Sequence, residues 1–263
     1  ERSSARESAA RVAAGSVAKR FLEKFGVSIH GRVVALGGVE AEEQTTFDWN
    51  LLEEVPYHVD RPNGSKMAAV RCSDPKAASR MIETIDAARE SGDSLGGTIE
   101  VVAEGLPIGL GSHIQWDRKL STRLAAAMMS INAVKGVEFG AGFRQSSLWG
   151  SQVHDVIAPF DSWGNNADGS MSRPWPRRTN NSGGLEGGMT TGEQLVIRAV
   201  VKPIATLING LETVDLVTGA RIDKAHYERS DITFVPTCAV IGEAMAAIVD
   251  AVKSRGLNDT DIQ

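Results

Sequence analysis

The chain has 263 residues, of which 42% are hydrophobic, so it holds enough apolar side chains for one large globular core. Its 33 acidic and 28 basic residues give a formal net charge of −5, which argues against a nucleic-acid partner that needs a basic face. Because the two cysteines lack the spacing of a disulfide framework or a zinc site, and no apolar run approaches the roughly 20 residues of a membrane span, we expect a cytoplasmic protein with neither a metal nor a membrane contact.

A long helix is the first predicted element, over residues 5–24. Ser4-Ala5-Arg6-Glu7 has the form of a capping box, in which the Ser4 hydroxyl accepts a hydrogen bond from a first-turn N–H and Glu7 reaches back. Gly26 is well placed to end this helix, because glycine tolerates a left-handed backbone. The β-branched residues within 27–34 then predict a strand.

The middle of the chain is predicted to contain both helices and strands. Residues 40–71 carry few periodic signals and are expected to be irregular. Asp74 and Pro75 predict the start of a helix, and Gly92 predicts its end. Apolar spacing predicts three further elements: a strand over 98–103, a helix that carries Leu120, Leu124, Ala127 and Met128, and a strand over 134–139.

The last part of the chain is predicted to hold a long loop and then more regular structure. Residues 158–182 are rich in Pro, Gly, Asn and Trp, which indicates a loop of the kind that often serves as a functional lid. Strands are expected over 194–201 and 231–235, and a final helix over 238–253. This irregular order of elements favours an α+β fold. Because no repeat and no clear linker divide the sequence, we expect a single domain over residues 1–263.

The segment 180–190 contains two glycine pairs, Gly183-Gly184 and Gly187-Gly188. Since glycine lacks a Cβ, the backbone N–H groups of such a segment can approach a flat ring or an anion closely. Glycine pairs also form plain turns, and the segment alone leaves both interpretations open.

Three arginines, Arg2, Arg6 and Arg229, are candidate anion-binding residues, because a guanidinium holds a phosphate or carboxylate through two parallel hydrogen bonds. Arg2 and Arg6 flank the start of the first predicted helix, where unpaired N–H groups and the helix dipole also favour an anion. Considered singly, each is more simply a solvated surface residue.

Several sequence blocks follow one another in a definite order along the chain. They are RSSARESAARVAAG from residue 2, GLPIGLGS from residue 105, MSINAVKGVE from residue 129, NNSGGLEGGMT from residue 180, KPIAT from residue 202 and ERSD from residue 228. In this order and spacing they resemble chorismate synthase, the flavin-dependent enzyme that closes the shikimate pathway. The resemblance runs from residue 1 to about residue 250.

The resemblance implies a fold, an activity and an assembly. The fold would be an α+β fold of the chorismate synthase type, a β-α-β sandwich in which mixed or antiparallel sheets pack on helices. The activity would be that of a carbon–oxygen lyase that converts 5-enolpyruvylshikimate 3-phosphate to chorismate by 1,4-elimination of phosphate, with reduced FMN, in aromatic amino acid biosynthesis. The assembly would be a homotetramer. We expect the sequence to be the C-terminal two-thirds of such an enzyme, because the family's N-terminal part is absent and Glu1 rather than Met comes first.

The resemblance also implies the site residues. The FMN-contacting positions are Arg2, Ser3, Ser4, Asn132, Ala133, Gly187, Lys202, Pro203, Ile204, Ala205, Thr206 and Arg229. Ser4, Arg6 and Arg229 lie where the family holds its substrate. Asp231 corresponds to an acidic residue near the flavin N5, where it would assist proton transfer as the catalytic residue. Each assignment has a plain alternative: Asn132 as a turn residue, Pro203 as a strand terminator and Asp231 as an exposed ion-pair partner.

None of the five histidines lies in a segment like the family's two histidine motifs, Gly-Glu-Ser-His-Gly and Arg-Pro-Gly-His-Ala-Asp. None has a carboxylate at ligand spacing, so we expect none to be catalytic. Two alternative functions therefore stay open. One is a general FMN-dependent oxidoreductase, which would oxidise a nicotinamide in stoichiometric amounts, and the other is a non-catalytic flavin-binding or assembly fragment.

Overall fold

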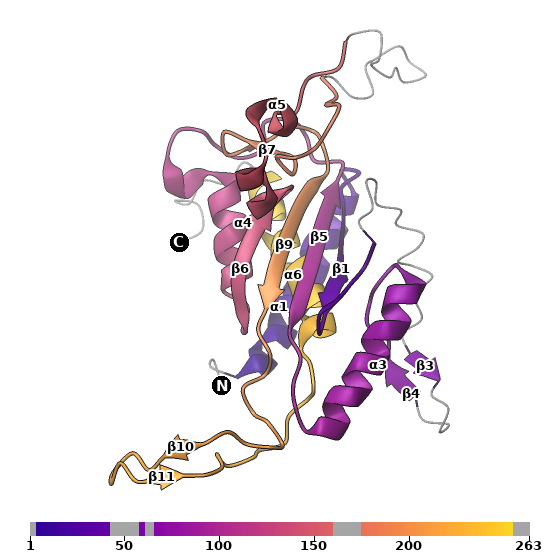
Figure 1. Cartoon of the computed structure of the whole chain (residues 1–263). Coiled ribbons are helices and arrows are strands. Elements are labelled where there is room, and N and C mark those ends of the chain that lie inside the picture. The colour runs from indigo at the N-terminus through magenta and orange to yellow at the C-terminus, as the bar shows by residue number, and fades with distance from the viewer. Residues whose placement is uncertain (1–3, 43–57, 61–65, 160–174, 255–263) are drawn as a thin grey trace. The chain divides into compact units, whose positions relative to one another are not determined.

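The computed structural model describes residues 4–42, 58–60, 66–159 and 175–254 (Figure 1). Its helices are η1 (Ala5–Glu7), α1 (Ser8–Glu23), α3 (Pro75–Ser91), η2 (Trp116–Arg118), α4 (Leu120–Met129), η3 (Gly142–Ser147), α5 (Gly150–Val153) and α6 (Val235–Ser254). Its strands are β1 (Ser28–Leu36), β2 (Val39–Glu40), β3 (His58–Asp60), β4 (Lys66–Ala68), β5 (Gly97–Glu104), β6 (Val134–Phe139), β7 (Leu185–Glu186), β8 (Met189–Thr190), β9 (Leu195–Val201), β10 (Thr213–Val214) and β11 (Arg221–Ile222). The predicted α+β class is confirmed.

The principal sheet has five strands in the order β2-β1-β5-β9-β6. β1 and β2 are antiparallel, with Ala35 opposite Glu40. β1 and β5 also run in opposite directions, because Gly105 lies against Gly26 near one end of the pair and Gly97 lies against Ala35 near the other. This antiparallel arrangement agrees with the predicted type of sheet.

Strand β9 lies between β5 and β6 and runs antiparallel to β5. Gln194, just before β9, donates a hydrogen bond to Glu104 at the end of β5, and Arg198 Nε donates to Glu100 Oε2 at 2.8 Å. Arg198 Nη1 lies 4.0 Å from Glu138 Oε1 on β6, so one guanidinium joins three strands. The buried residues alternate along β9: Leu195, Ile197, Ala199 and Val201. This alternation is the period of a strand with one face on a core.

The chain forms two compact units. The first consists of residues 1–31, 100–199 and 240–263, and the second of residues 32–99 and 200–239. Among the described residues, no helix is long and apolar enough to cross a bilayer.

In the first unit, helices α1 and α6 pack tightly against each other. A Cβ on Gly15 of α1 would lie only 2.4 Å from the Ala244 Cβ of α6, so the missing side chain permits the close approach. Glu243 of α6 accepts hydrogen bonds from the Lys19 ammonium and, at 2.9 Å, from the Gly31 N–H. One carboxylate therefore links both helices to β1.

The start of α1 differs in one respect from the predicted capping box. Ser4 Oγ accepts a hydrogen bond from the Arg6 N–H at 3.3 Å, which confirms the cap. The Glu7 carboxylate instead binds Arg11, with both of its oxygens 2.9 Å from Nε. The ion pair between Glu7 and Arg11, four residues apart on the helix surface, therefore replaces the predicted hydrogen bond from the backbone to the Glu7 carboxylate.

In the second unit, α3 begins and ends as predicted. Asp74 Oδ1 accepts hydrogen bonds from the N–H groups of Lys76 at 2.9 Å and Ala77 at 3.1 Å. Gly92 closes the helix with a left-handed φ of 72°. Its buried residues recur at helical spacing and form one face: Ala77, Met81, Ile85 and Ala88.

Two predictions about connecting regions are wrong. Residues 231–235, all of them described, form no strand: an isolated bridge joins Thr233 to Leu95, and Val235 begins α6. Pro236 explains the difference, because proline lacks an N–H and suits the first turn of a helix. Of residues 40–71, the ranges 43–57 and 61–65 lie outside the described residues, and the described part contains the antiparallel pair β3–β4 rather than only irregular structure. Much of the predicted loop over 158–182 lies outside the described residues.

Candidate functional site

The glycine-rich segment forms a tight hairpin in the first unit. β7 pairs antiparallel with β8, and Gly187 and Gly188 make the two-residue turn between them. Their φ angles are 59° and 88°. A left-handed backbone at both central positions defines a type I′ turn, which favours glycine and matches the twist of the paired strands.

The four glycines of this segment have different environments. Gly187, the position expected to contact the flavin, faces open space, since a Cβ there would meet nothing within 4 Å. A Cβ on any of the other three would collide: 2.3 Å from Gly140 N for Gly183, 2.5 Å from Gln194 O for Gly184 and 2.5 Å from Lys119 Cγ for Gly188. Three glycines are therefore explained by packing, and one presents its backbone to the surface.

Helix α1 also lies against the turn that follows α4 in the first unit. Arg11 Nη1 donates hydrogen bonds to Ser130 O at 3.2 Å and to Ser130 Oγ at 2.8 Å. The same guanidinium holds Glu7 through Nε. Arg11 thereby joins the beginning of α1 to the α4–β6 turn.

Four predicted ligand positions gather around this junction. Ser4 and Arg6 lie at η1, directly before α1, while Asn132 and Ala133 lie between α4 and β6. Arg6 and Asn132 are exposed. Ala133 has a left-handed φ of 68°, which is uncommon outside glycine and marks a constrained turn. Arg11 links the two regions, and an exposed guanidinium such as that of Arg6 is a group that binds anionic ligands.

Gly187 lies at the opposite end of α4 from this junction. The neighbouring Gly188 O accepts a hydrogen bond at 2.9 Å from the N–H of Leu120, the first residue of α4. Asn132 and Ala133 follow the last turn of the same helix. With 10 residues, α4 is about 15 Å long, so the first unit does not bring Gly187 beside Asn132 and Ala133.

In the second unit, the connector between α3 and β5 contacts two further segments that carry predicted positions. Ser94 Oγ donates a hydrogen bond to Ile204 O at 2.6 Å. The next N–H, from Leu95, donates to Ile232 O at 2.8 Å. Two adjacent residues thus hold the segment Lys202–Thr206 close to the segment that carries Arg229 and Asp231.

The charged residues of this second cluster are accessible. Lys202, Arg229 and Asp231 are all exposed, and no residue from 202 to 231 is buried. The second unit therefore presents two cations and one carboxylate to solvent, which are side-chain types that bind anions and transfer protons in proteins.

The remaining predicted residues fall outside these clusters. Arg2 and Ser3 lie outside the described residues. Of the histidines, His113, His154 and His226 are exposed, His30 is on β1 and His58 is on β3. Within the described part of the chain, no group of three His, Cys, Asp or Glu side chains is arranged to hold a metal ion.

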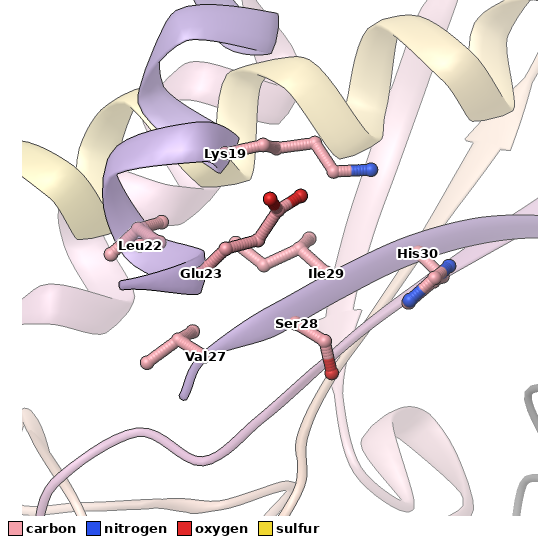
Figure 2. A pocket seen from close by; sticks show the side chains of 7 residues that line it. All are labelled: Lys19, Leu22, Glu23, Val27, Ser28, Ile29 and His30. Atoms are coloured by element: carbon pink, nitrogen blue, oxygen red, sulfur yellow. The ribbon is translucent and has the colours of Figure 1, made fainter. Parts of the chain in front are cut away.

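A small pocket lies between the end of α1 and the start of β1, lined by Lys19, Leu22, Glu23, Val27, Ser28, Ile29 and His30 (Figure 2). Its volume is about 50 Å³, whereas ligand pockets usually measure roughly 300–1,000 Å³. No predicted ligand position lines it, and Lys19 is already paired with Glu243. The pocket is therefore not a flavin site.

Sequence reasoning missed several residues that shape these clusters. Asp155, Arg11 and Ser94 each hold a predicted site segment through hydrogen bonds. Asp155 is buried, and its partners Thr179, Asn181 and Ser182 lie far along the chain. No local motif signals such a long-range partner, so only the tertiary structure reveals it.

The antiparallel sheet with its packed helices places the chain in the class of α+β proteins. The family model for chorismate synthase matches residues 1–252. The chain is 48% identical over 247 residues to a chorismate synthase of Geobacillus sp. (strain WCH70), covering 94% of this chain and 58% of that protein. It is 50% identical over 248 residues to that of Geobacter metallireducens, covering 94% of this chain and 60% of that protein. The chain belongs to the chorismate synthase family.

A solved structure gives the same result at the level of the fold. A crystal structure of chorismate synthase matches 95% of this chain and 63% of its own length, with a TM-score of 0.69 and 38% sequence identity. The fold expected from the sequence blocks is confirmed. The chain spans about three-fifths of the length of the relatives named above.

Proposed function

We propose that this chain is the C-terminal part, as a single domain, of an enzyme that makes chorismate from 5-enolpyruvylshikimate 3-phosphate. The observation that supports this most strongly is the 48% identity to a named chorismate synthase over 94% of the chain. The proposal includes reduced FMN as cofactor and action in the cytoplasm as a homotetramer, as the resemblance implies.

The residues present fit a flat cofactor that carries a phosphate. Gly187 faces open space, so a ring can approach its backbone without meeting a side chain. Arg6, Lys202 and Arg229 are exposed cations that suit the phosphate of FMN and the anionic groups of the substrate. When bound, reduced FMN would supply an electron-rich ring beside the substrate.

The protein's share of the reaction is placement and proton handling. Phosphate leaves C3 with its bonding electrons and a proton leaves C6, so the ring gains a double bond with no net redox change. Ser4, Arg6 and Arg229 would orient the substrate anions, and each hydrogen bond to a charged group contributes roughly 1.5–3 kcal/mol. Asp231, exposed beside Arg229, would hold or relay the proton.

A pair of measurements on the full natural chain tests the proposal. Under anaerobic conditions with reduced FMN, we expect chorismate and phosphate to appear in equal amounts without oxidation of a nicotinamide. Reduced FMN should also bind more tightly when the substrate is present, because both ligands would contact Arg229. Stoichiometric nicotinamide oxidation would favour the hydride-transfer alternative, and flavin binding without turnover would favour the non-catalytic one.

A further inference from the structure

We propose that Asp155 is a positioning residue that fixes the backbone of residues 179–188 and thereby sets how Gly187 meets the flavin. This inference rests on the proposed function, because the role of Gly187 is part of it. Asp155 lies just after α5 in the first unit, and, in the part of the chain that the structure describes, its side-chain hydrogen bonds go to residues other than the predicted ligand positions. It would act only through the segment that it holds.

The Asp155 carboxylate accepts hydrogen bonds from three residues of one short stretch of chain, Thr179, Asn181 and Ser182. Oδ1 accepts from Thr179 Oγ1 at 2.6 Å and from the Asn181 N–H at 2.8 Å, and Oδ2 accepts from the Ser182 N–H at 2.8 Å. Both carboxylate oxygens are used, and Asp155 is buried with only 8% of its surface exposed. Hydrogen bonds to an ionised acceptor are short and roughly twice as strong as neutral ones.

A second set of contacts connects Asp155 to the β7–β8 hairpin through Arg177. Arg177 Nη1 donates to the backbone oxygen of Asp155 at 3.1 Å, and Arg177 Nη2 donates to Glu186 Oε2 at 2.9 Å. Glu186 is the residue directly before Gly187. The Asp155 side chain therefore holds the beginning of the segment, and its main chain holds the end through Arg177.

The backbone between these two anchors has little freedom to compensate for their loss. Asn180 Oδ1 accepts from the Gly184 N–H at 2.7 Å, and Asn180 Nδ2 donates to Gln194 O at 2.7 Å. Gly183 packs on the main chain of Gly140, where even a Cβ would not fit. The segment is thus closely packed except at its tip, and a change at Asp155 should be transmitted to Gly187.

The chemistry at this position requires a carboxylate. The groups that face it are all donors: the Thr179 hydroxyl, the N–H groups of Asn181 and Ser182, and the Ser182 side chain. A carboxylate is a pure acceptor, whereas an amide would turn an NH₂ group toward an N–H. In Asp155→Asn, one N–H would lose its partner while the size of the side chain stays the same. This variant therefore tests the hydrogen bonds rather than the packing.

The test is a titration of the full natural chain with FMN, followed by flavin fluorescence, for wild type, Asp155→Asn and the control Asp74→Ala. Asp74 also accepts hydrogen bonds from two backbone N–H groups, but it caps α3 in the second unit. We expect Asp155→Asn to weaken FMN binding about tenfold and to change the absorbance spectrum of the bound flavin. The control should lower the urea midpoint and leave both flavin readouts at the wild-type values.

Each outcome separates the two hypotheses. If Asp155→Asn does not fold, Thr179→Val removes one donor and should weaken FMN binding severalfold. Wild-type affinity and spectrum in the folded Asp155→Asn variant, or in Thr179→Val, would overturn the positioning role and leave the proposed function intact. If the wild-type chain itself binds no FMN, the proposed function fails and the positioning role fails with it. Equal losses of affinity in Asp155→Asn and Asp74→Ala would show that the effect is only one of stability.

Discussion

The glycine-rich segment 179–190 and the segment 202–231 both carry predicted flavin contacts, yet they are built in opposite ways. The first is packed into its unit, and its buried residues are Gly183, Gly184, Leu185, Gly188 and Thr190. The second has no buried residue, and at the tip of its β10–β11 hairpin Leu216 and Val217 are 95% and 94% exposed.

The difference concerns what holds each segment in shape. Long-range hydrogen bonds and glycine packing fix the first segment before any ligand arrives. The hairpin is shaped mainly by local contacts, such as those of Asp215 Oδ1, which accepts from the N–H groups of Val217 at 3.0 Å and Thr218 at 2.7 Å. An isolated two-stranded hairpin is only marginally stable, so we expect the β10–β11 hairpin to open at a lower free-energy cost than the first segment.

The largest expected effect comes from adding one methyl group to the packed segment. Gly183→Ala would place a Cβ 2.3 Å from Gly140 N at a φ of 64°, so overpacking and backbone strain add together. We expect a loss of roughly 2–5 kcal/mol in the free energy of unfolding, measured with urea. Gly187→Ala is the matched control, since it has strain without a collision and should lose only about 1 kcal/mol. Equal losses would show that the segment is not closely packed.

In the exposed segment 202–231, the substitution with the largest expected effect should lower the rate of chorismate formation and leave the free energy of unfolding unchanged. Asp231→Asn should leave flavin and substrate bound but slow chorismate formation by roughly a hundredfold or more, because a neutral isostere cannot relay the proton. Asp231 is exposed, so the urea midpoint should stay unchanged. Single-turnover absorbance under anaerobic conditions separates binding from chemistry. Conversion at the wild-type rate would reduce Asp231 to a surface residue.

Replacing the exposed Arg6 should weaken substrate affinity, by a free energy similar to or smaller than the effect of Asp231→Asn on the reaction barrier. Arg6→Ala should weaken substrate binding by roughly 1.5–3 kcal/mol without loss of stability, if the guanidinium holds an anionic group. Arg20→Ala is the control, in the helix α1 that directly follows η1, because the Arg20 side chain is 83% exposed and pairs with Glu23 on the helix surface. Calorimetric titration of both variants makes the comparison. Two equally small effects would place Arg6 among the solvated surface residues.

Lowering the pH should have the smallest effect on the free energy of unfolding. It should act on the packed segment by protonating Asp155. Burial alone would raise the pKa of Asp155, but hydrogen bonds from Thr179, Ser182 and Asn181 outweigh it and hold the pKa below its ordinary value. A lowered folded pKa gives stability that is present above the unfolded pKa of about 4 and is lost as pH falls toward the folded pKa.

The corresponding measurement is the urea midpoint from about pH 5 to about pH 3, where protonation of Asp155 should cost roughly 1 kcal/mol. Asp155→Asn cannot ionise, so its midpoint should fall less steeply with acid than that of the wild type. Parallel curves for the two proteins would mean that Asp155 makes no net contribution through its charge.

The sequence by itself determined most of the regular elements, because their causes are local. Ser4 and Asp74 cap their helices through N–H groups two or three residues away, and Gly92 ends α3 by its own left-handed backbone. The ordered blocks from Arg2 to Asp231 also indicated the family, since each is a short run of adjacent residues. The strand predicted over 231–235 failed because Pro236 lets α6 start early at Val235.

Only the tertiary structure decided which residues hold the candidate site together. Asp155 reaches Asn181 across 26 positions, and Ser94 reaches Ile204 across 110 positions, so no local pattern could reveal either contact. The same holds for the glycines: the sequence shows four similar residues, but only the packed chain distinguishes Gly187, open to a ligand, from Gly183, enclosed by main chain. A local motif fixes a backbone preference, whereas what a side chain or its absence contacts depends on the rest of the fold.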